Sequence, residues 1–242
     1  MLINLPSHNE VVEITEKEFA EVRFWAEELR IYQDWYEGKR DMLYFTPAPT
    51  DDAKIKGKDD EESAILTWME LHQKPKYLHD LQLETYAFRG LKVLDIGAGP
   101  FPSATCFEEI ELFALDPLAD IYEALGFFRK PFPNIHFTAS QAEEMPFESD
   151  FIDAVISVNA IDHVDNFEET AAEICRVLKP GGKFAMHVHY HEATECEPLE
   201  LNDERFLSAF SEVEDLQPIC RSRQSFGTLL PETEEFVLWR NF

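Results

Sequence analysis

The segment Val93–Pro100, with the sequence VLDIGAGP, constrains the fold more than any other part of the chain. It is typical of a buried strand that carries a carboxylate, Asp95, near its end and then turns at once through Gly97 and Gly99. A strand that leads through a glycine turn into a helix brings backbone N–H groups close to a ligand. A second acid, Asp116, follows the next apolar run, where a carboxylate in a doubly wound sheet can bind both hydroxyls of a ribose. The two acids together predict a cofactor that contains a nucleoside.

The same turn disfavours a pyrophosphate. In dinucleotide-binding turns a third glycine lets the helix and the strand pack closely, and this chain has Pro102 at that place. Asp95, two residues before the first glycine, would repel a phosphate but suits a cation. S-adenosylmethionine offers an ammonium, a sulfonium and a ribose without phosphate, so it fits the turn better than a nicotinamide dinucleotide. The alternative without a ligand is an ordinary strand–helix turn, in which Asp95 caps the helix.

Four further segments follow the glycine turn in the order and spacing of the class I S-adenosylmethionine-dependent methyltransferases, which the chain resembles from about residue 91 to 189. They are Leu115–Leu118 (LDPL), Ser140–Phe147 (SQAEEMPF), Phe151–His163 (FIDAVISVNAIDH) and Leu178–Lys183 (LKPGGK). The resemblance implies a bound S-adenosylmethionine and the transfer of its methyl group.

The resemblance also assigns residues to parts of the cofactor. It implies that Asp95 and the glycine turn hold the methionine part, and that Asp116 binds the ribose. Gln141 stands where the family usually has an acid that accepts from the adenine amino group, and its amide carbonyl can accept the same hydrogen bond. The implied cofactor-binding residues are Asp95, Gly97, Ala98, Gly99, Asp116, Pro117, Leu118, Gln141, Ala142 and Asn159.

Candidates for catalysis follow the expected strands 152–158 and 183–190, because the crevice of an open α/β sheet lies beyond the carboxyl ends of its strands. Methyl transfer from a sulfonium mainly requires that donor and acceptor are aligned and that water is excluded. His163 is the first candidate for a general base, and Asp162 could orient an acceptor hydroxyl. His189 is the second candidate base. For His163 the alternative is a packing role beside the cofactor.

Three alternate histidines, His187, His189 and His191, end the strand 183–190, and they point to one side of it. One interpretation is a metal site with Glu192 or Glu195. Histidines two apart on a strand lie about 6–7 Å from each other at Cα, which permits a metal but does not demand one. We therefore expect no metal, with His187 buried by the sheet and the other two histidines at the edge of the acceptor pocket.

The composition excludes some classes of acceptor. The net charge of −27 would repel RNA, DNA and anionic lipid, so we expect a small-molecule acceptor and neither a nucleic-acid nor a membrane partner. A looser similarity to bacterial methyltransferases of sugars and natural products favours a hydroxyl group. The four cysteines form no CxxC motif, and the first ten residues do not resemble a signal peptide, which favours the cytoplasm. Two alternatives are a non-catalytic protein that binds the cofactor or a partner on the same fold, and a nicotinamide-dependent oxidoreductase.

Residues 1–90 are predicted to form an N-terminal helical cap. A capping box at Thr15–Glu18 begins a helix with an aromatic stripe, which includes Trp25 and ends near Gly38. Core packing is the ordinary role of such a stripe, but the resemblance implies that N-terminal helices cover the cofactor cleft. A loop is expected over 46–62, followed by helices over 63–73 and 76–88 that Pro75 separates.

Residues 91–242 are predicted to form the S-adenosylmethionine-binding methyltransferase domain, an α/β fold. Apolar runs without alternation indicate strands that are covered on both faces, as in a parallel sheet. The resemblance implies a Rossmann-like, doubly wound, mostly parallel seven-stranded sheet with an antiparallel last strand. Strands are expected near 91–96, 111–115, 134–138, 152–158, 183–190, 213–221 and 234–240. Helices are expected near 102–109, 118–126, 167–178 and 202–210.

Overall fold

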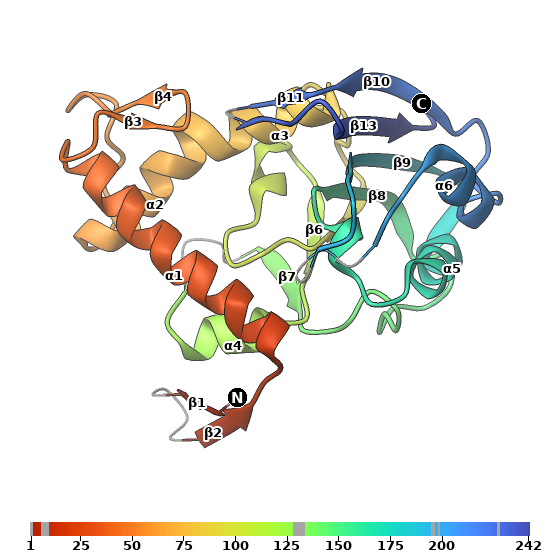
Figure 1. Cartoon of the computed structure of the whole chain (residues 1–242), viewed down its shortest axis with the longest axis horizontal. Helices are drawn as coiled ribbons and strands as arrows, with labels where there is room; N and C mark the ends of the chain where they lie inside the picture. The colour runs from red at the N-terminus through yellow and green to blue at the C-terminus, as the bar shows by residue number, and fades with distance from the viewer. Residues whose placement is uncertain (1, 6–9, 128–133, 195–196, 198, 227) are drawn as a thin grey trace.

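The computed structural model describes residues 2–5, 10–127, 134–194, 197, 199–226 and 228–242. At its centre is a seven-stranded sheet with the order β10-β13-β9-β8-β5-β6-β7 (Figure 1). Strands β9, β8, β5, β6 and β7 are parallel, and β13 is antiparallel to both of its neighbours. The predicted fold class and all seven expected strands are confirmed. Their bounds are β5 (Lys92–Ile96), β6 (Glu111–Leu115), β7 (Ile135–Thr138), β8 (Ile152–Val158), β9 (Leu178–Tyr190), β10 (Gln217–Ser222) and β13 (Glu235–Arg240).

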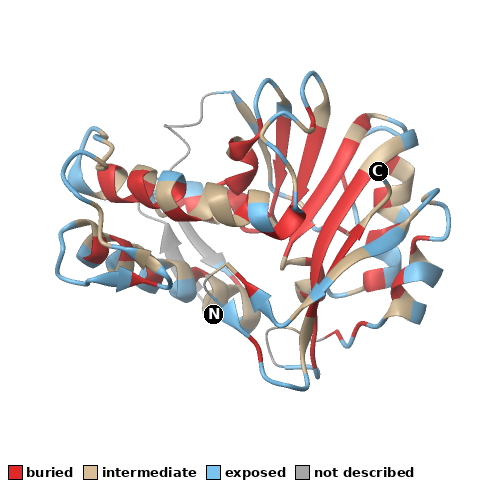
Figure 2. Cartoon of the chain, turned by 90° about the horizontal axis from the view of Figure 1, so that it is seen from above, coloured by how far each residue is buried: buried red, intermediate tan, exposed pale blue. Residues whose placement is uncertain are grey.

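The central strands are buried on both faces (Figure 2), which explains their unbroken apolar runs. On one face, Leu94 and Val155 belong to a core cluster with α5 (Phe167–Val177) and α6 (Asp203–Ala209). On the other face, Val93 belongs to a cluster with α3 (Lys74–Leu81). Alternate residues of one strand therefore face different helices, and Asp95 shares the α3 face with Val93.

The N-terminal helices cover the loops that follow β5 and β6. Helix α1 (Glu16–Tyr36) begins at the predicted capping box on Thr15, and α2 (Asp60–Trp68) packs beside it through Tyr32, which stacks on Trp68. Their core cluster includes Phe101 from the loop after β5, and Leu118 and Tyr122 at α4 (Ala119–Ala124). Figure 1 shows α1 passing close to α4, away from α5 and α6. In the described part of the chain, no helix is both long enough and apolar enough to cross a membrane.

Pro75 does not separate two helices, so that prediction was wrong. A π-helical turn, Met69–Gln73, joins α2 directly to α3, in which Pro75 occupies the first turn. A proline removes one N–H and collides with the carbonyl four residues earlier in an α-helix, and a π turn accommodates both changes. The predicted helix 76–88 ends at Leu81 instead, because Gln82 takes a left-handed cap conformation with φ of 50°.

The helix predicted over 102–109 is only a short 3-10 helix, Ser103–Cys106. Pro102 before it is extended and Phe107 after it is extended, and the N–H of Glu108 then bonds to the carbonyl of Thr85. The chain leaves the helix at once to reach β6. The remaining predicted helices of the sheet domain are confirmed, and the boundary between cap and sheet domain at residue 90 stays a prediction.

Three short hairpins were not predicted. They are β1 (Leu2–Leu5) with β2 (Glu10–Glu13), β3 (Met42–Leu43) with β4 (Thr46–Pro47), and β11 (Gln224–Ser225) with β12 (Thr228–Leu229). The second of them occupies the start of the loop expected over 46–62, and the first turn of α2 occupies its end.

Candidate functional site

The chain turns after β5 through Gly97 and Gly99, as predicted, but the N–H groups of the turn bond within the protein instead of facing a ligand as expected. Gly97 and Gly99 have φ values of +70° and +61°, which L side chains rarely adopt. A Cβ on Gly97 would lie 2.3 Å from the Cβ of Ala160, so the loop after β8 requires a glycine here. The N–H groups of Gly97 and Ala98 both donate to the carbonyl of Leu115, at 2.9 and 3.1 Å. These two N–H groups hold the turn against β6 instead of facing a ligand.

Asp116 fixes the remaining part of the turn. Its Oδ2 accepts the N–H of Gly99 and its Oδ1 accepts the N–H of Leu118, each at 2.9 Å. Burial raises the pKa of Asp116 to about 6, although these two hydrogen bonds oppose the rise. A carboxylate oxygen can accept more than one hydrogen bond, so both oxygens retain the capacity to accept from ribose hydroxyls. Of its neighbours, Pro117 is exposed and Leu118 is buried in the core cluster that contains α1 and α2.

Asp95 lies beneath the turn and faces α3. It is fully buried, and its Oδ1 accepts a hydrogen bond from the hydroxyl of Tyr77 at 3.0 Å. Burial raises the pKa of Asp95 to about 7, against the effect of the Tyr77 hydroxyl. No local sequence pattern had indicated this partner. A contact between Asp95 and the methionine part of a cofactor stays a prediction.

Helix α1 lies directly on the turn. A Cβ on Gly99 would meet the indole ring of Trp25 at 3.1 Å, and the Nε1 of Trp25 donates to Glu21 at 3.0 Å. The charge of Glu21 also acts on Asp116. The aromatic stripe of α1 therefore reaches the glycine turn through Trp25, and Glu21 beside it was not predicted to be a site residue.

The residues expected around adenine and at the mouth of the site lie beyond the ends of β7 and β8. Gln141 is exposed and Ala142 is buried. Asn159 has φ of 54°, and its N–H donates to the carbonyl of His187 at 2.9 Å. The Oδ1 of Asn159 is buried and makes no hydrogen bond within the described part of the chain. Strained backbone and a buried unsatisfied oxygen are features that cluster at functional positions.

The three predicted catalytic residues do come together, beyond the ends of β8 and β9. Asp162 is fully buried, and its Oδ2 lies 3.3 Å from the Nε2 of His191. The Nε2 of His163 lies 3.5 Å from Glu197. Burial acts to lower the pKa of His163, but the carboxylates of Glu197 and Asp162 outweigh it, so that this pKa is raised. The ring of His189 lies 4.5 Å from that of His191.

His191 and Glu197 were not among the predicted catalytic residues, although they join them. The hydrogen bond to Asp162 raises the pKa of His191 to about 9, although burial acts to lower it. Glu192 contacts His191 only through its carbonyl, at 2.7 Å, and Glu195 lies outside the described residues. His187 is buried against Phe236, as expected.

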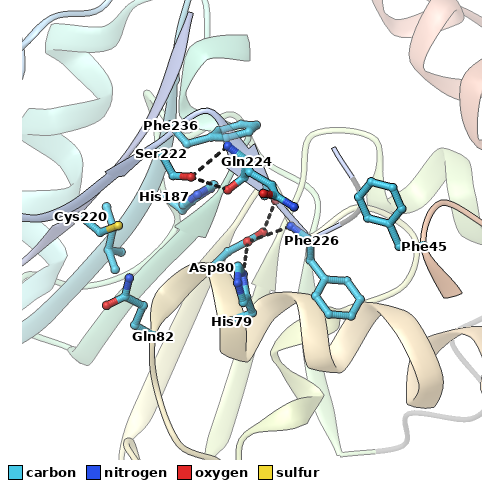
Figure 3. Close-up of a pocket in the computed structure, with 12 residues that line it drawn as sticks. Phe45, His79, Asp80, Gln82, His187, Cys220, Ser222, Gln224, Phe226 and Phe236 are labelled. Carbon is cyan, nitrogen blue, oxygen red and sulfur yellow. Dashed lines mark hydrogen bonds and ion pairs between the residues drawn. The ribbon is translucent and has the colours of Figure 1, made fainter. Parts of the chain in front are cut away.

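Two cavities flank this part of the sheet. One, of about 420 Å³, opens beside His191 and is lined by five glutamates and by Arg223, among other residues. The other, of about 360 Å³, lies between α3 and β13, where Figure 3 shows Asp80 between His79 and Phe226. His191 lines the first cavity, which therefore adjoins the cluster of predicted catalytic residues. Of the three histidines on the strand, only His187 lines the second cavity.

Comparisons with known proteins agree with the fold. Residues 94–186 match the model of a family described as a methyltransferase domain. An uncharacterized methyltransferase of Bacillus subtilis, YcgJ, is 32% identical over 103 residues, which are 41% of each chain. The chain matches only 36–54% of the length of its curated relatives. The crystal structure of YcgJ covers 69% of this chain and 96% of its own, with a TM-score of 0.54 and 18% identity. A complex of the Haloferax volcanii Trm112 methyltransferase activator with a methyltransferase gives the same TM-score and identity over 73% of this chain and 93% of that one.

Proposed function

We propose that the chain is a class I S-adenosylmethionine-dependent methyltransferase, which its similarity to methyltransferases supports, and that it transfers the methyl group to a hydroxyl of a small-molecule acceptor. The observation that carries the choice of cofactor is the glycine turn. Its first N–H groups are held by Leu115 and Asp116, so a pyrophosphate would find no free donors there. The carboxyl groups of Asp116 and Glu21 lie close to the turn, and their negative charge favours the binding of an ammonium or a sulfonium.

Each part of the cofactor is proposed to bind to specific residues. Asp116 accepts the ribose hydroxyls, and Gln141 with Ala142 lies beside the adenine. The turn at Gly97 and the buried Asp95 hold the methionine part, and Trp25 on α1 excludes water from it. Asn159 presents its unsatisfied oxygen where the two substrates meet.

The acceptor is proposed to lie at the edge formed by Asp162, His163 and His189, next to the 420 Å³ cavity. When bound, the cofactor supplies a methyl group on a cationic sulfur, which accepts the electron pair of the broken carbon–sulfur bond as an acceptor oxygen bonds to the carbon. Asp162 orients the acceptor hydroxyl, and the imidazole of His163 or His189 takes the proton that the hydroxyl loses. The glutamates of the cavity favour a neutral or cationic polyhydroxy acceptor over an anionic one. Action in the cytoplasm is proposed, supported by the free thiols of Cys106, Cys175 and Cys220.

Binding and transfer are tested separately. Calorimetry with S-adenosylmethionine and S-adenosylhomocysteine measures cofactor binding by the folded protein, and mass spectrometry follows methyl transfer to a panel of sugars, phenols and hydroxy acids. We expect binding of both nucleosides and transfer to at least one hydroxyl acceptor. Retention of the cofactor without any transfer would favour a non-catalytic binding protein. Stabilisation by NAD but not by S-adenosylmethionine would overturn the proposal.

Asp116→Ala is expected to weaken S-adenosylmethionine binding by about 1–3 kcal/mol, the scale of hydrogen bonds to a charged group, which is roughly 5- to 150-fold in Kd. The substitution removes the acceptor for the ribose and for two backbone N–H groups. Calorimetry of the variant measures the loss, and Glu148→Ala, an exposed acid outside the site, is the matched control. Equal affinity of the two variants would refute the ribose assignment.

His163→Ala is expected to lower kcat by about 10²–10⁴-fold if His163 is the base, the usual contribution of general base catalysis. Cofactor affinity should remain unchanged, because the imidazole is assigned to the acceptor. Initial rates with the acceptor found above measure the effect, and His136→Ala, an exposed histidine on β7, serves as control. Normal turnover by His163→Ala would leave His189 as the candidate base.

A further inference from the structure

Four potential metal ligands converge beyond the carboxyl ends of β8 and β9. Asp162, His189, His191 and Glu197 each offer one ligand atom, and these atoms all lie within 4.8 Å of one another. The first three residues are at most 9% exposed. We propose that these four side chains bind one divalent transition-metal cation. The proposal departs from the expectation drawn from the sequence, which placed no metal here.

The orientation of His191 is the first argument. Its Nδ1 lies 2.7 Å from the carbonyl of Glu192, an acceptor only, so Nδ1 carries a hydrogen and donates it. Its Nε2 faces carboxylate oxygens of Asp162 at 3.3 Å and Glu197 at 4.0 Å. Three electron-rich atoms so placed repel one another unless a proton or a metal cation lies between them. A bound metal can coordinate all three atoms at once, whereas a proton on Nε2 can form a good hydrogen bond to only one of the two carboxylates.

The surroundings of the ligands are the second argument. Metal-binding histidines almost always donate their other ring N–H to a carbonyl or a carboxylate, which fixes the ring. The carbonyl of Glu192 serves His191 in this way, and Glu234 lies 2.9 Å from the Nε2 of His189. Independently, the Oδ1 of Asp162 is buried and makes no hydrogen bond within the described part of the chain. A buried carboxylate oxygen without a donor is costly, and coordination removes that cost.

The spacing of the ligands is close to what a cation requires. In a tetrahedral site with bonds of about 2.0–2.2 Å, any two ligand atoms are roughly 3.4 Å apart. The most distant pair of ligand atoms here, at up to 4.8 Å, must close by about 1.4 Å, a distance that rotation of the histidine and glutamate side chains can cover. Two carboxylates also neutralise a divalent charge, and the net charge of −27 raises the local concentration of cations.

The donor set selects the class of metal. Two imidazoles with two carboxylates suit zinc, iron, cobalt or manganese, whereas Mg²⁺ and Ca²⁺ prefer oxygen ligands alone. The cation would lie at the edge where the acceptor is proposed to bind and would occupy His189, which leaves His163 as the candidate base; any part of the metal in methyl transfer rests on the proposed function. Its binding does not, and a protein that binds the metal but transfers no methyl group would refute only the function.

The test measures metal binding by the whole chain without any cofactor. Protein treated with a chelator and dialysed is titrated with Zn²⁺, Mn²⁺ and Mg²⁺ in separate calorimetric experiments. We expect one equivalent of Zn²⁺ per chain, with Mg²⁺ bound at least 100-fold more weakly. Thermal unfolding should shift to higher temperature with Zn²⁺, because a ligand that binds only the folded state stabilises it.

Variants locate the bound ion. His191→Ala and Asp162→Asn should each weaken Zn²⁺ binding by at least 100-fold and abolish the thermal shift, while His136→Ala should bind as the unaltered protein does. Circular dichroism confirms that each variant is folded before titration, and a variant that does not fold is replaced by His191→Gln. The proposal is overturned if the chelator-treated, folded protein binds no Zn²⁺, or if His191→Ala and His191→Gln retain full affinity.

Discussion

Gly97→Ala is expected to destabilise the protein by about 2–5 kcal/mol and to abolish detectable binding of S-adenosylmethionine. The left-handed backbone at φ of +70° costs an alanine about 1–2 kcal/mol. The new methyl group would also lie 2.3 Å from the Cβ of Ala160, and overpacking of this kind costs a further 1–3 kcal/mol or so. The loop after β8 must then move away from the turn, which would carry Asn159 away from the proposed cofactor site. Denaturant unfolding and calorimetry measure the two effects.

Two further variants separate strain from collision. Gly181→Ala has the same φ of +70° but would meet nothing within 4 Å, so it should show the cost of strain alone. Ala160→Gly removes the obstructing methyl group, and combined with Gly97→Ala it should recover the part of the loss that the collision causes. If Gly97→Ala costs no more than Gly181→Ala, the packing of the two loops described above is wrong.

The sheet was the part of the fold that local sequence could predict. Each central strand is an unbroken apolar run between turn residues, and burial on both faces produces that pattern without help from distant residues. The glycine turn could also be predicted from local sequence, because Gly97 and Gly99 have backbone angles that other residues rarely adopt. The bounds predicted for α5 and α6 agree with the structure to within one residue. By contrast, the helix break predicted at Pro75 was wrong, because a π turn accommodates a proline that the interior of an α-helix would not.

Side-chain pairs between distant elements were not predictable in this way. Tyr77 approaches Asp95 from α3, and Ser225 approaches Asp80 across 145 positions of the chain. Nothing in the local pattern marks such partners. The pair of His191 with Asp162 is an intermediate case, because both follow neighbouring parallel strands and so meet at one edge of the sheet. That rule of topology was available from the sequence, but it did not indicate which of three histidines would turn toward the acid.

Asp80→Ala is expected to be among the most destabilising substitutions, at about 3–5 kcal/mol, the usual cost of removing one partner from a buried ion pair. The side chain of Asp80 is 1% exposed, and its Oδ2 accepts from Lys76 at 2.7 Å and from Ser225 at 2.8 Å. Its Oδ1 lies 3.0 Å from the Nδ1 of His79 (Figure 3). The variant leaves a partly buried ammonium and a buried hydroxyl without their acceptor, and the contact that ties α3 to β11 is lost. Thermal unfolding at pH 7 should show a decrease in Tm of roughly 6–20 °C.

The effect should depend on pH in a definite direction. Burial acts to raise the pKa of Asp80, but Lys76 and the other donors outweigh it and lower the pKa from 3.8 to about 2. A depressed carboxyl pKa contributes stability that is present above pH 4 and is lost as the pH falls toward 2. The difference in unfolding free energy between the unaltered protein and Asp80→Ala should therefore shrink by about 2 kcal/mol from pH 7 to pH 2. Asp51→Ala, which removes a 99% exposed partner of Lys54, should cost less than about 1 kcal/mol at pH 7. Equal costs for the two variants, or a difference that grows as the pH is lowered, would contradict the assignment of a charged, fully bonded Asp80.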